Sequence, residues 1–229
     1  MKRIGTSIEG AVAALSEGRV IIVMDSSDRE NEGDFLAVAE KITPAAIHFM
    51  ITQGRGQLCM PVMPQLAQRL QLTPLIPQRD LNAPCFAMPV DYRTCKTGIS
   101  PLERALTIRA MLDPSTTASD FVRPGHIFPL IAQPEGILVR AGHTEAAVDL
   151  ARLAGLTPAG VLCEICSRDG LNMAEGWELM ELAEEFQLPI ITIDELILFR
   201  QLYGRTIPNS LFAPAAAAAC DLDRVAHSG

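Results

Sequence analysis

Apolar residues recur along the chain with two different spacings, which together predict interleaved helices and strands. Apolar positions three and four residues apart, bounded by capping residues, glycine or proline, are typical of amphipathic helices. Continuous apolar runs of strand length, bounded by turn residues, indicate buried strands. We therefore expect helices at 7–15, 44–54, 64–70, 101–112, 144–154, 174–187 and 194–203. We expect strands at 20–24, 35–39, 57–61, 85–90, 127–132, 136–139, 158–165 and 189–193.

Two of these helices carry strong start signals. Ser100 precedes Pro101 and is followed by Glu103, which is the pattern of a capping box with proline at the first helical position. Thr43 stands before Pro44 in the same way and is the expected N-cap of its helix.

The order of the elements indicates the fold class. Several strands follow one another directly in sequence, which favours a mixed sheet covered by helices. The 229 residues contain no linker long enough to divide the chain, so we expect a single α+β domain over 1–204. The segment 205–229 is rich in alanine and proline and has no obvious core face. We expect it to be a poorly ordered C-terminal tail.

Composition and charge exclude several classes of partner. The formal net charge is -8 and the pI is about 5.0, so the long-range field repels polyanions and we expect no nucleic-acid partner. No apolar run approaches the ~20 residues of a membrane span, and the N-terminus lacks the apolar core of a signal peptide. We expect a cytoplasmic protein with no membrane partner.

The cysteines indicate reduced thiols. Six cysteines without framework-like spacing are typical of a cytosolic protein. Cys163 and Cys166 form a C-x-x-C pattern, but they lie in an apolar run that is expected to be a strand. Residues three apart in a strand face opposite sides, so half of a zinc site is a poor interpretation.

The segment 28–34 places four carboxylates in seven residues, between two expected strands. If it is extended, the carboxylates share one face, where a cation or a shared proton must offset their repulsion. A solvated turn is the simplest alternative. A calcium loop is a second, but the twelfth position is Ala39 rather than the bidentate glutamate. A hard cation such as magnesium, held by one or two carboxylates, fits better.

The segment 140–144 lies where an expected strand ends and an expected helix begins. Arg140, the Thr144 hydroxyl and the free amides of the helix start would form a phosphate site. An ordinary N-cap threonine is the alternative. Beside such an anion site, His143 could serve as a metal ligand or a proton carrier.

Two further side chains could carry chemistry. His126 follows Arg123-Pro124-Gly125, which we expect to be a rigid turn just before a strand, although a lone loop histidine is often merely exposed. Glu164 is the only acidic residue in the apolar run 159–166. A carboxylate in such a run pairs with a cation or takes part in chemistry.

Taken together, the motifs resemble those of the 3,4-dihydroxy-2-butanone 4-phosphate synthase family. The motifs are D-R-E-N-E-G-D, T-G-I-S, R-P-G-H-I-F-P-L, R-A-G-H-T-E-A and P-A-G-V-L-C-E, and the resemblance spans about Ser7 to Tyr203. It implies a lyase of riboflavin biosynthesis that converts D-ribulose 5-phosphate to L-3,4-dihydroxy-2-butanone 4-phosphate and formate. The implied cofactor is Mg²⁺ or Mn²⁺, with two ions per active site and no organic cofactor.

The resemblance also implies an architecture and an assembly. The expected fold is a three-layer α/β/α sandwich around a mixed sheet, assembled as a homodimer with active sites near the subunit interface. Some relatives carry a following GTP cyclohydrolase II domain. Because the chain stops at Gly229, we expect the monofunctional form.

The resemblance assigns roles to individual residues. The implied metal ligands are Glu30 and His143. The implied substrate-binding residues are Arg29, Glu30, Asp34, Arg140, Ala141, Gly142, His143, Thr144 and Glu164. The implied catalytic residues are His126, Glu164, Glu32, Asp34 and Cys59.

Three loops depart from the family pattern, at Ser26-Ser27, at 93–96 and at Ser167-Arg168. They leave open a second hypothesis, a non-catalytic paralogue that binds a sugar phosphate or a protein partner. A third hypothesis is a nucleotide- or RNA-binding module, which the charge of -8 disfavours.

Overall fold

A seven-stranded mixed sheet forms the centre of the molecule. The structure, a computed structural model, describes residues 5–26, 31–77, 80 and 82–203. The strand order is β4-β5-β3-β6-β2-β1-β7. The strands are β1 (Ile21–Met24), β2 (Gly33–Val38), β3 (Arg55–Val62), β4 (Val90–Tyr92), β5 (Phe121–Ile131), β6 (Gly160–Ile165) and β7 (Ile190–Thr192).

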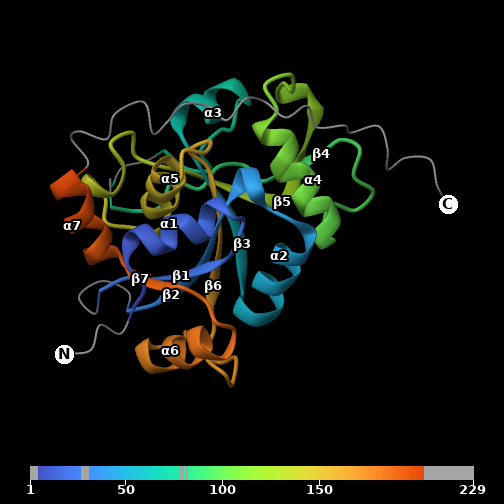
Figure 1. Cartoon of the computed structure of the whole chain (residues 1–229). Helices are drawn as coiled ribbons and strands as arrows, with labels where there is room; N and C mark the ends of the chain where they lie inside the picture. The colour runs from blue at the N-terminus through green and yellow to red at the C-terminus, as the bar shows by residue number, and fades with distance from the viewer. Residues whose placement is uncertain (1–4, 27–30, 78–79, 81, 204–229) are drawn as a thin grey trace.

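Helices cover both faces of this sheet (Figure 1). The α-helices are α1 (Ile8–Ser16), α2 (Pro44–Phe49), α3 (Pro64–Arg69), α4 (Pro101–Leu112), α5 (His143–Leu153), α6 (Gly176–Glu185) and α7 (Ile193–Tyr203). Of the two largest buried clusters, one joins the sheet to α1, α5 and α7, and the second joins it to α2, α4 and α6. The predicted three-layer α/β/α arrangement around a mixed sheet is confirmed.

Strand alternation decides which side chains enter which cluster. Phe35 and Ala37 on β2 pack toward α2 and α4, whereas Leu36 and Val38 pack toward α1 and α5. Successive strand residues point to opposite faces of a sheet. Asp34 therefore projects to the α5 side, with Leu36 and Val38.

The helix starts confirm the predicted caps, with one difference. Thr43 accepts a hydrogen bond from the Ala46 amide at 3.0 Å, and Ser100 accepts one from the Glu103 amide at 3.2 Å. The Glu103 carboxylate does not complete a capping box, however. It accepts hydrogen bonds from the amides of residues 96–98 and from the Thr97 hydroxyl, so it fixes the T-G-I-S loop instead.

Two predicted strands are wrong. Residues 136–138 form a 3₁₀ turn (η4, Gly136–Leu138), because Gly136 adopts a φ of +71° and the Ile137 amide donates to the buried Asp149 carboxylate. Of the strand expected at 85–90, residues 85–89 form only isolated bridges, and β4 begins at Val90. Proline has no N–H to donate to a ladder, and Pro84 and Pro89 flank this segment.

The segment 123–126 also differs from its prediction. It was expected to be a turn before a strand, but it lies inside β5, as a bulge against β4. The ladder pairs Asp91 with Val122 and Val90 with Ile127, so the intervening residues of β5 have no partners in register. A bulge re-aims side chains, and here it turns His126 toward β4.

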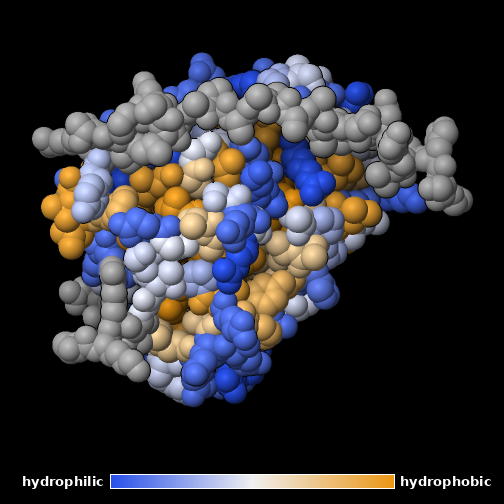
Figure 2. Space-filling view, in the orientation of Figure 1, coloured by the Kyte–Doolittle hydropathy of each residue, from blue (hydrophilic) through white to orange (hydrophobic). Residues whose placement is uncertain are grey.

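Some large apolar side chains remain on the surface. Leu198, Leu202 and Tyr203 of α7 are exposed, and Figure 2 shows apolar residues gathered over this helix. Among the described residues, the helices are too short or too polar to cross a lipid bilayer. The predicted tail 205–229 lies outside the described residues and stays a prediction.

Candidate active site

Three of the predicted site residues meet on the α5 side of the sheet. Asp34 on β2 pairs in register with Glu164 on β6, and Cys59 on β3 pairs with Leu162 on β6. Paired residues share a face, and so do residues two apart in a strand. Cys59, Glu164 and Asp34 therefore line one face across three adjacent strands.

His143, the first residue of α5, lies next to this group. Its side chain is buried, Nε2 lies 3.1 Å from the Val23 carbonyl oxygen, and Nδ1 lies 3.8 Å from Asp34 Oδ2. A carbonyl oxygen only accepts hydrogen bonds, so Nε2 carries the proton. In the neutral ring the Nδ1 lone pair then faces the Asp34 carboxylate, an arrangement that suits a cation near both groups.

The carboxylate and imidazole groups at this site are suitable ligands for a divalent cation. Carboxylate oxygens suit magnesium and manganese. Across 5–26, 31–77, 80 and 82–203, no three His, Cys, Asp or Glu side chains are grouped to hold a metal. Glu30 and Arg29 lie outside the described residues. The predicted metal site of Glu30 and His143 therefore stays a prediction.

Glu164 is held in place by the backbone of β3. Its Oε2 accepts a hydrogen bond from the Gln57 amide at 2.7 Å. A Cβ on Gly56 would lie 2.5 Å from the Glu164 carbonyl oxygen and 2.7 Å from Oε2. Only glycine leaves room for this approach, which the sequence did not reveal.

We expect Gly56→Ala to lower the rate of the proposed reaction. The added methyl group must displace the Glu164 carboxylate, and a misplacement of about 1 Å can cost about 10²-fold in rate. Gly176→Ala is the matched control, because among the described residues its Cβ would meet only Met24 Cε, at 3.5 Å. Steady-state formate release measures both, and equal activity of the two variants would contradict the role given to Gly56.

Cys59 lies in the same group but is poorly suited to be a nucleophile. It is 2% exposed. Burial raises the pKa of its thiol well above the usual range, and the nearby Glu164 and Asp34 carboxylates raise it further. The thiol is therefore neutral near pH 7, so its predicted catalytic role is better restricted to lining the site.

We expect Cys59→Ala to keep formate release within about tenfold of the wild type, since a neutral thiol is neither nucleophile nor base. In the native protein Cys59 should resist alkylation by iodoacetamide, and unfolding should make it reactive. Mass spectrometry of the alkylated peptides measures this. Rapid native alkylation with loss of all activity would restore the nucleophile interpretation.

The predicted phosphate site surrounds the start of α5. Gly142 is the N-cap and has no side chain to accept from the first helical amides, so Thr144 is not the N-cap. Arg140 is buried, with Nη1 2.6 Å from Glu145 Oε2 and Nε 2.9 Å from the Asn82 carbonyl oxygen. Ala141 is exposed beside them. The amides and the fixed cation are consistent with anion binding at this terminus.

Asp25 and Glu32, which lie between β1 and β2, are joined by two hydrogen bonds. The Glu32 amide donates to Asp25 Oδ1 at 2.8 Å, and the Asp25 amide donates to the Glu32 carbonyl at 3.1 Å. Asp25 is buried although the sequence did not single it out. This closure places Glu32 at the same edge of the sheet as Asp34.

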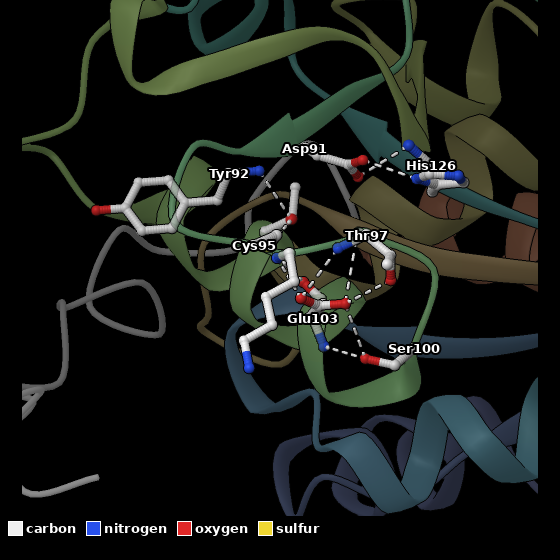
Figure 3. A network of polar contacts seen from close by, with 10 residues as sticks. Asp91, Tyr92, Cys95, Thr97, Ser100, Glu103 and His126 are labelled. Atoms are coloured by element: carbon white, nitrogen blue, oxygen red, sulfur yellow. Dashed lines mark hydrogen bonds and ion pairs between the residues drawn. The ribbon is translucent and has the colours of Figure 1, made fainter. Parts of the chain in front are cut away.

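His126 occupies a separate place. It belongs to β5, two strands away from Glu164, and its ring faces Asp91 on β4. Figure 3 shows these two side chains beside the network that Glu103 makes with the T-G-I-S loop. Asp91 is not among the predicted site residues, because its only local signal is that it ends an apolar run.

Sequence comparisons agree with this geometry. Residues 9–199 match the profile of the family described as 3,4-dihydroxy-2-butanone 4-phosphate synthase. The riboflavin biosynthesis protein RibBA of Bacillus cytotoxicus is 53% identical over 195 residues, which cover 85% of this chain and 49% of that protein. The corresponding protein of Bacillus mycoides is 52% identical over the same length. The chain spans about half the length of these curated relatives.

Solved structures show the same architecture. RibBX of A. baumannii, a two-domain 3,4-dihydroxy-2-butanone 4-phosphate synthase, superposes with a TM-score of 0.83 at 43% identity, covering 86% of this chain and 59% of that one. A 3,4-dihydroxy-2-butanone 4-phosphate synthase in complex with two magnesium ions superposes with a TM-score of 0.80 at 32% identity. That match covers 87% of this chain and 98% of the other.

Proposed function

This chain belongs to the 3,4-dihydroxy-2-butanone 4-phosphate synthase family, and we propose that it converts D-ribulose 5-phosphate to L-3,4-dihydroxy-2-butanone 4-phosphate and formate. The observation that carries the proposal is the group formed by Asp34, Glu164 and His143. Three separate family motifs supply these residues, and the sheet and α5 bring them together.

The chain's own residues bind the two ends of the substrate. The phosphate group is held at the start of α5 by Arg140, Ala141, Gly142 and Thr144, with Arg29 from outside the described residues. The hydroxyl and carbonyl oxygens face the carboxylates of Asp34 and Glu32. This orientation places the carbon next to the ketone near Glu164.

Glu164 accepts the first proton, from that carbon. One of its oxygens is fixed by the Gln57 amide, so the carboxylate is oriented before the substrate binds. Loss of the C1 hydroxyl as water, a shift of the carbon skeleton and addition of one water then release C4 as formate. His126 and Asp34 exchange protons with the substrate oxygens in these steps.

A divalent cation held by Glu30 and His143, Mg²⁺ or Mn²⁺, would stabilise negative charge on the substrate oxygens. The relative in complex with two magnesium ions supports two ions per site. The acid/base groups named above account for the proton transfers, so no organic cofactor is proposed.

We also propose a homodimer with the active sites near its interface. Leu75 and Ile76 are exposed beside Pro77, Pro84 and Phe86, and these residues line an apolar groove. Apolar surface of this kind is typical of a contact region. The Asn82 carbonyl accepts from Arg140 Nε, which places this loop next to the proposed phosphate site. Sedimentation equilibrium measures the assembly, and a monomer at micromolar concentration would contradict it.

The origin of the formate tests the reaction. Ribulose 5-phosphate labelled with ¹³C at C4 should yield ¹³C-formate, whereas a C1 label should remain in the four-carbon product. ¹³C NMR of the mixture distinguishes the two. Label from C1 in formate would contradict the proposed sequence of bond cleavages.

A further inference from the structure

We propose that Asp91 is a positioning residue that holds His126 as the tautomer with its proton on Nδ1, leaving the lone pair on Nε2. The inference rests on the proposed function for the catalytic role of His126. The tautomer itself is a property of this chain and can be measured without substrate.

The contacts between the two side chains define the tautomer. Asp91 Oδ2 lies 2.7 Å from His126 Nδ1, and Asp91 Oδ1 accepts a hydrogen bond from the His126 amide at 2.9 Å. An ionised carboxylate only accepts hydrogen bonds, so Nδ1 must donate. Because Asp91 Oδ1 binds the backbone amide of His126 while Oδ2 binds its ring, the ring and the carboxylate are fixed relative to each other.

The two side chains of this pair differ in their exposure to solvent. The Asp91 side chain is 12% exposed, whereas the His126 side chain is 41% exposed. The Asp91 carboxylate therefore lies on the buried side of the His126 ring, next to Nδ1. Nε2 lies at the opposite end of the ring. In the neutral ring Nε2 then carries the lone pair that can exchange a proton with substrate.

The R-P-G-H motif is shaped around Asp91. The bulge in β5 brings Gly125 so close to β4 that a Cβ would overlap the backbone of Val90 and Asp91. The Gly125 amide donates to the Pro89 carbonyl at 3.0 Å. A side chain at this position would push β5 away from β4 and separate the His126 amide from Asp91.

The T-G-I-S motif packs against the same carboxylate from another direction. Gly98 has a φ of +78°, and a Cβ there would overlap the Asp91 carboxylate. Glu103 fixes this loop by accepting from the Gly98 amide at 3.1 Å. Two family motifs thus converge on Asp91, which belongs to neither.

A partly buried cation, Arg104, lies close to this pair. The Nε of Arg104 on α4 is buried and has no hydrogen-bond partner among the described residues. Burial lowers the pKa of Arg104, and the nearby Cys163 and Asp91 oppose that shift. Arg104 therefore lies close enough to Asp91 for the two charges to interact.

The tautomer can be observed directly by NMR. In protein labelled with ¹⁵N-histidine, long-range ¹H–¹⁵N correlations distinguish a protonated ring nitrogen from one with a lone pair. The chain has 4 histidines, and His126→Gln identifies the relevant signals by their loss. We expect the neutral His126 ring of the wild type to carry its proton on Nδ1.

Substitution at Asp91 should change both the tautomer and the rate. The side-chain amide introduced by Asp91→Asn can present an N–H to the ring, so this change should shift the proton toward Nε2 and lower kcat by about 10²- to 10⁴-fold. KM should change little, because Asp91 does not contact substrate. Asp91→Glu restores a carboxylate and should recover the Nδ1 tautomer and part of kcat.

Asp120→Asn is the matched control, since Asp120 pairs with Arg93 near the same strands without contacting His126. It should alter neither the tautomer nor kcat. A wild-type ring protonated on Nε2 would overturn the proposal, even if Asp91→Asn does not fold. A changed tautomer with full kcat would overturn the positioning role. Failure of the wild type to release formate would instead contradict the proposed function and leave the tautomer measurement intact.

Discussion

Glu164→Gln should reduce formate release by about 10²- to 10⁴-fold, the contribution typical of a positioned general base. Glutamine keeps an oxygen that can accept the Gln57 hydrogen bond now made at 2.7 Å. It cannot take a proton from substrate. The loss should therefore appear in kcat, while the thermal unfolding midpoint stays close to that of the wild type.

Glu40 provides a matched control for this substitution. Its Oε2 also accepts a hydrogen bond from a backbone amide, that of Thr157 at 2.8 Å. It lies near the far ends of β2 and β6, because β2 ends at Val38 opposite Gly160. Glu40→Gln should retain activity. If Glu164→Gln were as active as Glu40→Gln, proton abstraction by Glu164 would be contradicted.

Asp149→Ala should lower the free energy of unfolding by about 3–5 kcal/mol, as expected when one partner of a buried ion pair is removed. Asp149 is fully buried on α5 and accepts a hydrogen bond from the Ile137 amide at 3.0 Å. It also accepts from Arg152 Nη1 at 3.0 Å. Arg200 Nε of α7 lies 3.2 Å away, in an ion pair without hydrogen-bond geometry.

The cause of this loss lies in the groups that remain. Burial raises the pKa of Asp149, and Arg200, the Ile137 amide and Arg152 oppose the shift. Truncation leaves the partly buried Arg200 without its anion and removes the hydrogen bond that links η4 to α5. Urea denaturation measures the change. Glu181→Ala, which removes an exposed ion pair with Arg168, should cost about 1 kcal/mol or less. Equal effects of the two substitutions would contradict this account.

Helices and strands were predicted well where residues close together in the sequence determine them. The Thr43 and Ser100 caps are such cases, because each side chain satisfies an amide three residues away. The strand expected at 136–139 does not form, because the Ile137 amide donates to Asp149, 12 residues further along the chain, and the segment becomes a turn. A short apolar run does not reveal such a partner.

The candidate site follows the same division. Glu164 and His143 stand out in sequence as polar residues where buried elements begin or end. Asp91 does not, because its partner His126 lies 35 residues away and meets it only through a bulge. The need for glycine at position 56 likewise depends on the approach of Glu164 from β6. Pairings between distant strands create both features.

The decisive experiment is to measure formate release from ribulose 5-phosphate by the purified chain, with magnesium and with excess chelator. With magnesium we expect formate and the four-carbon phosphate in equal amounts. We expect no formate with chelator, and none from His143→Ala in either condition. A folded, magnesium-loaded wild-type protein that binds ribulose 5-phosphate and releases no formate would contradict the account and favour a non-catalytic paralogue.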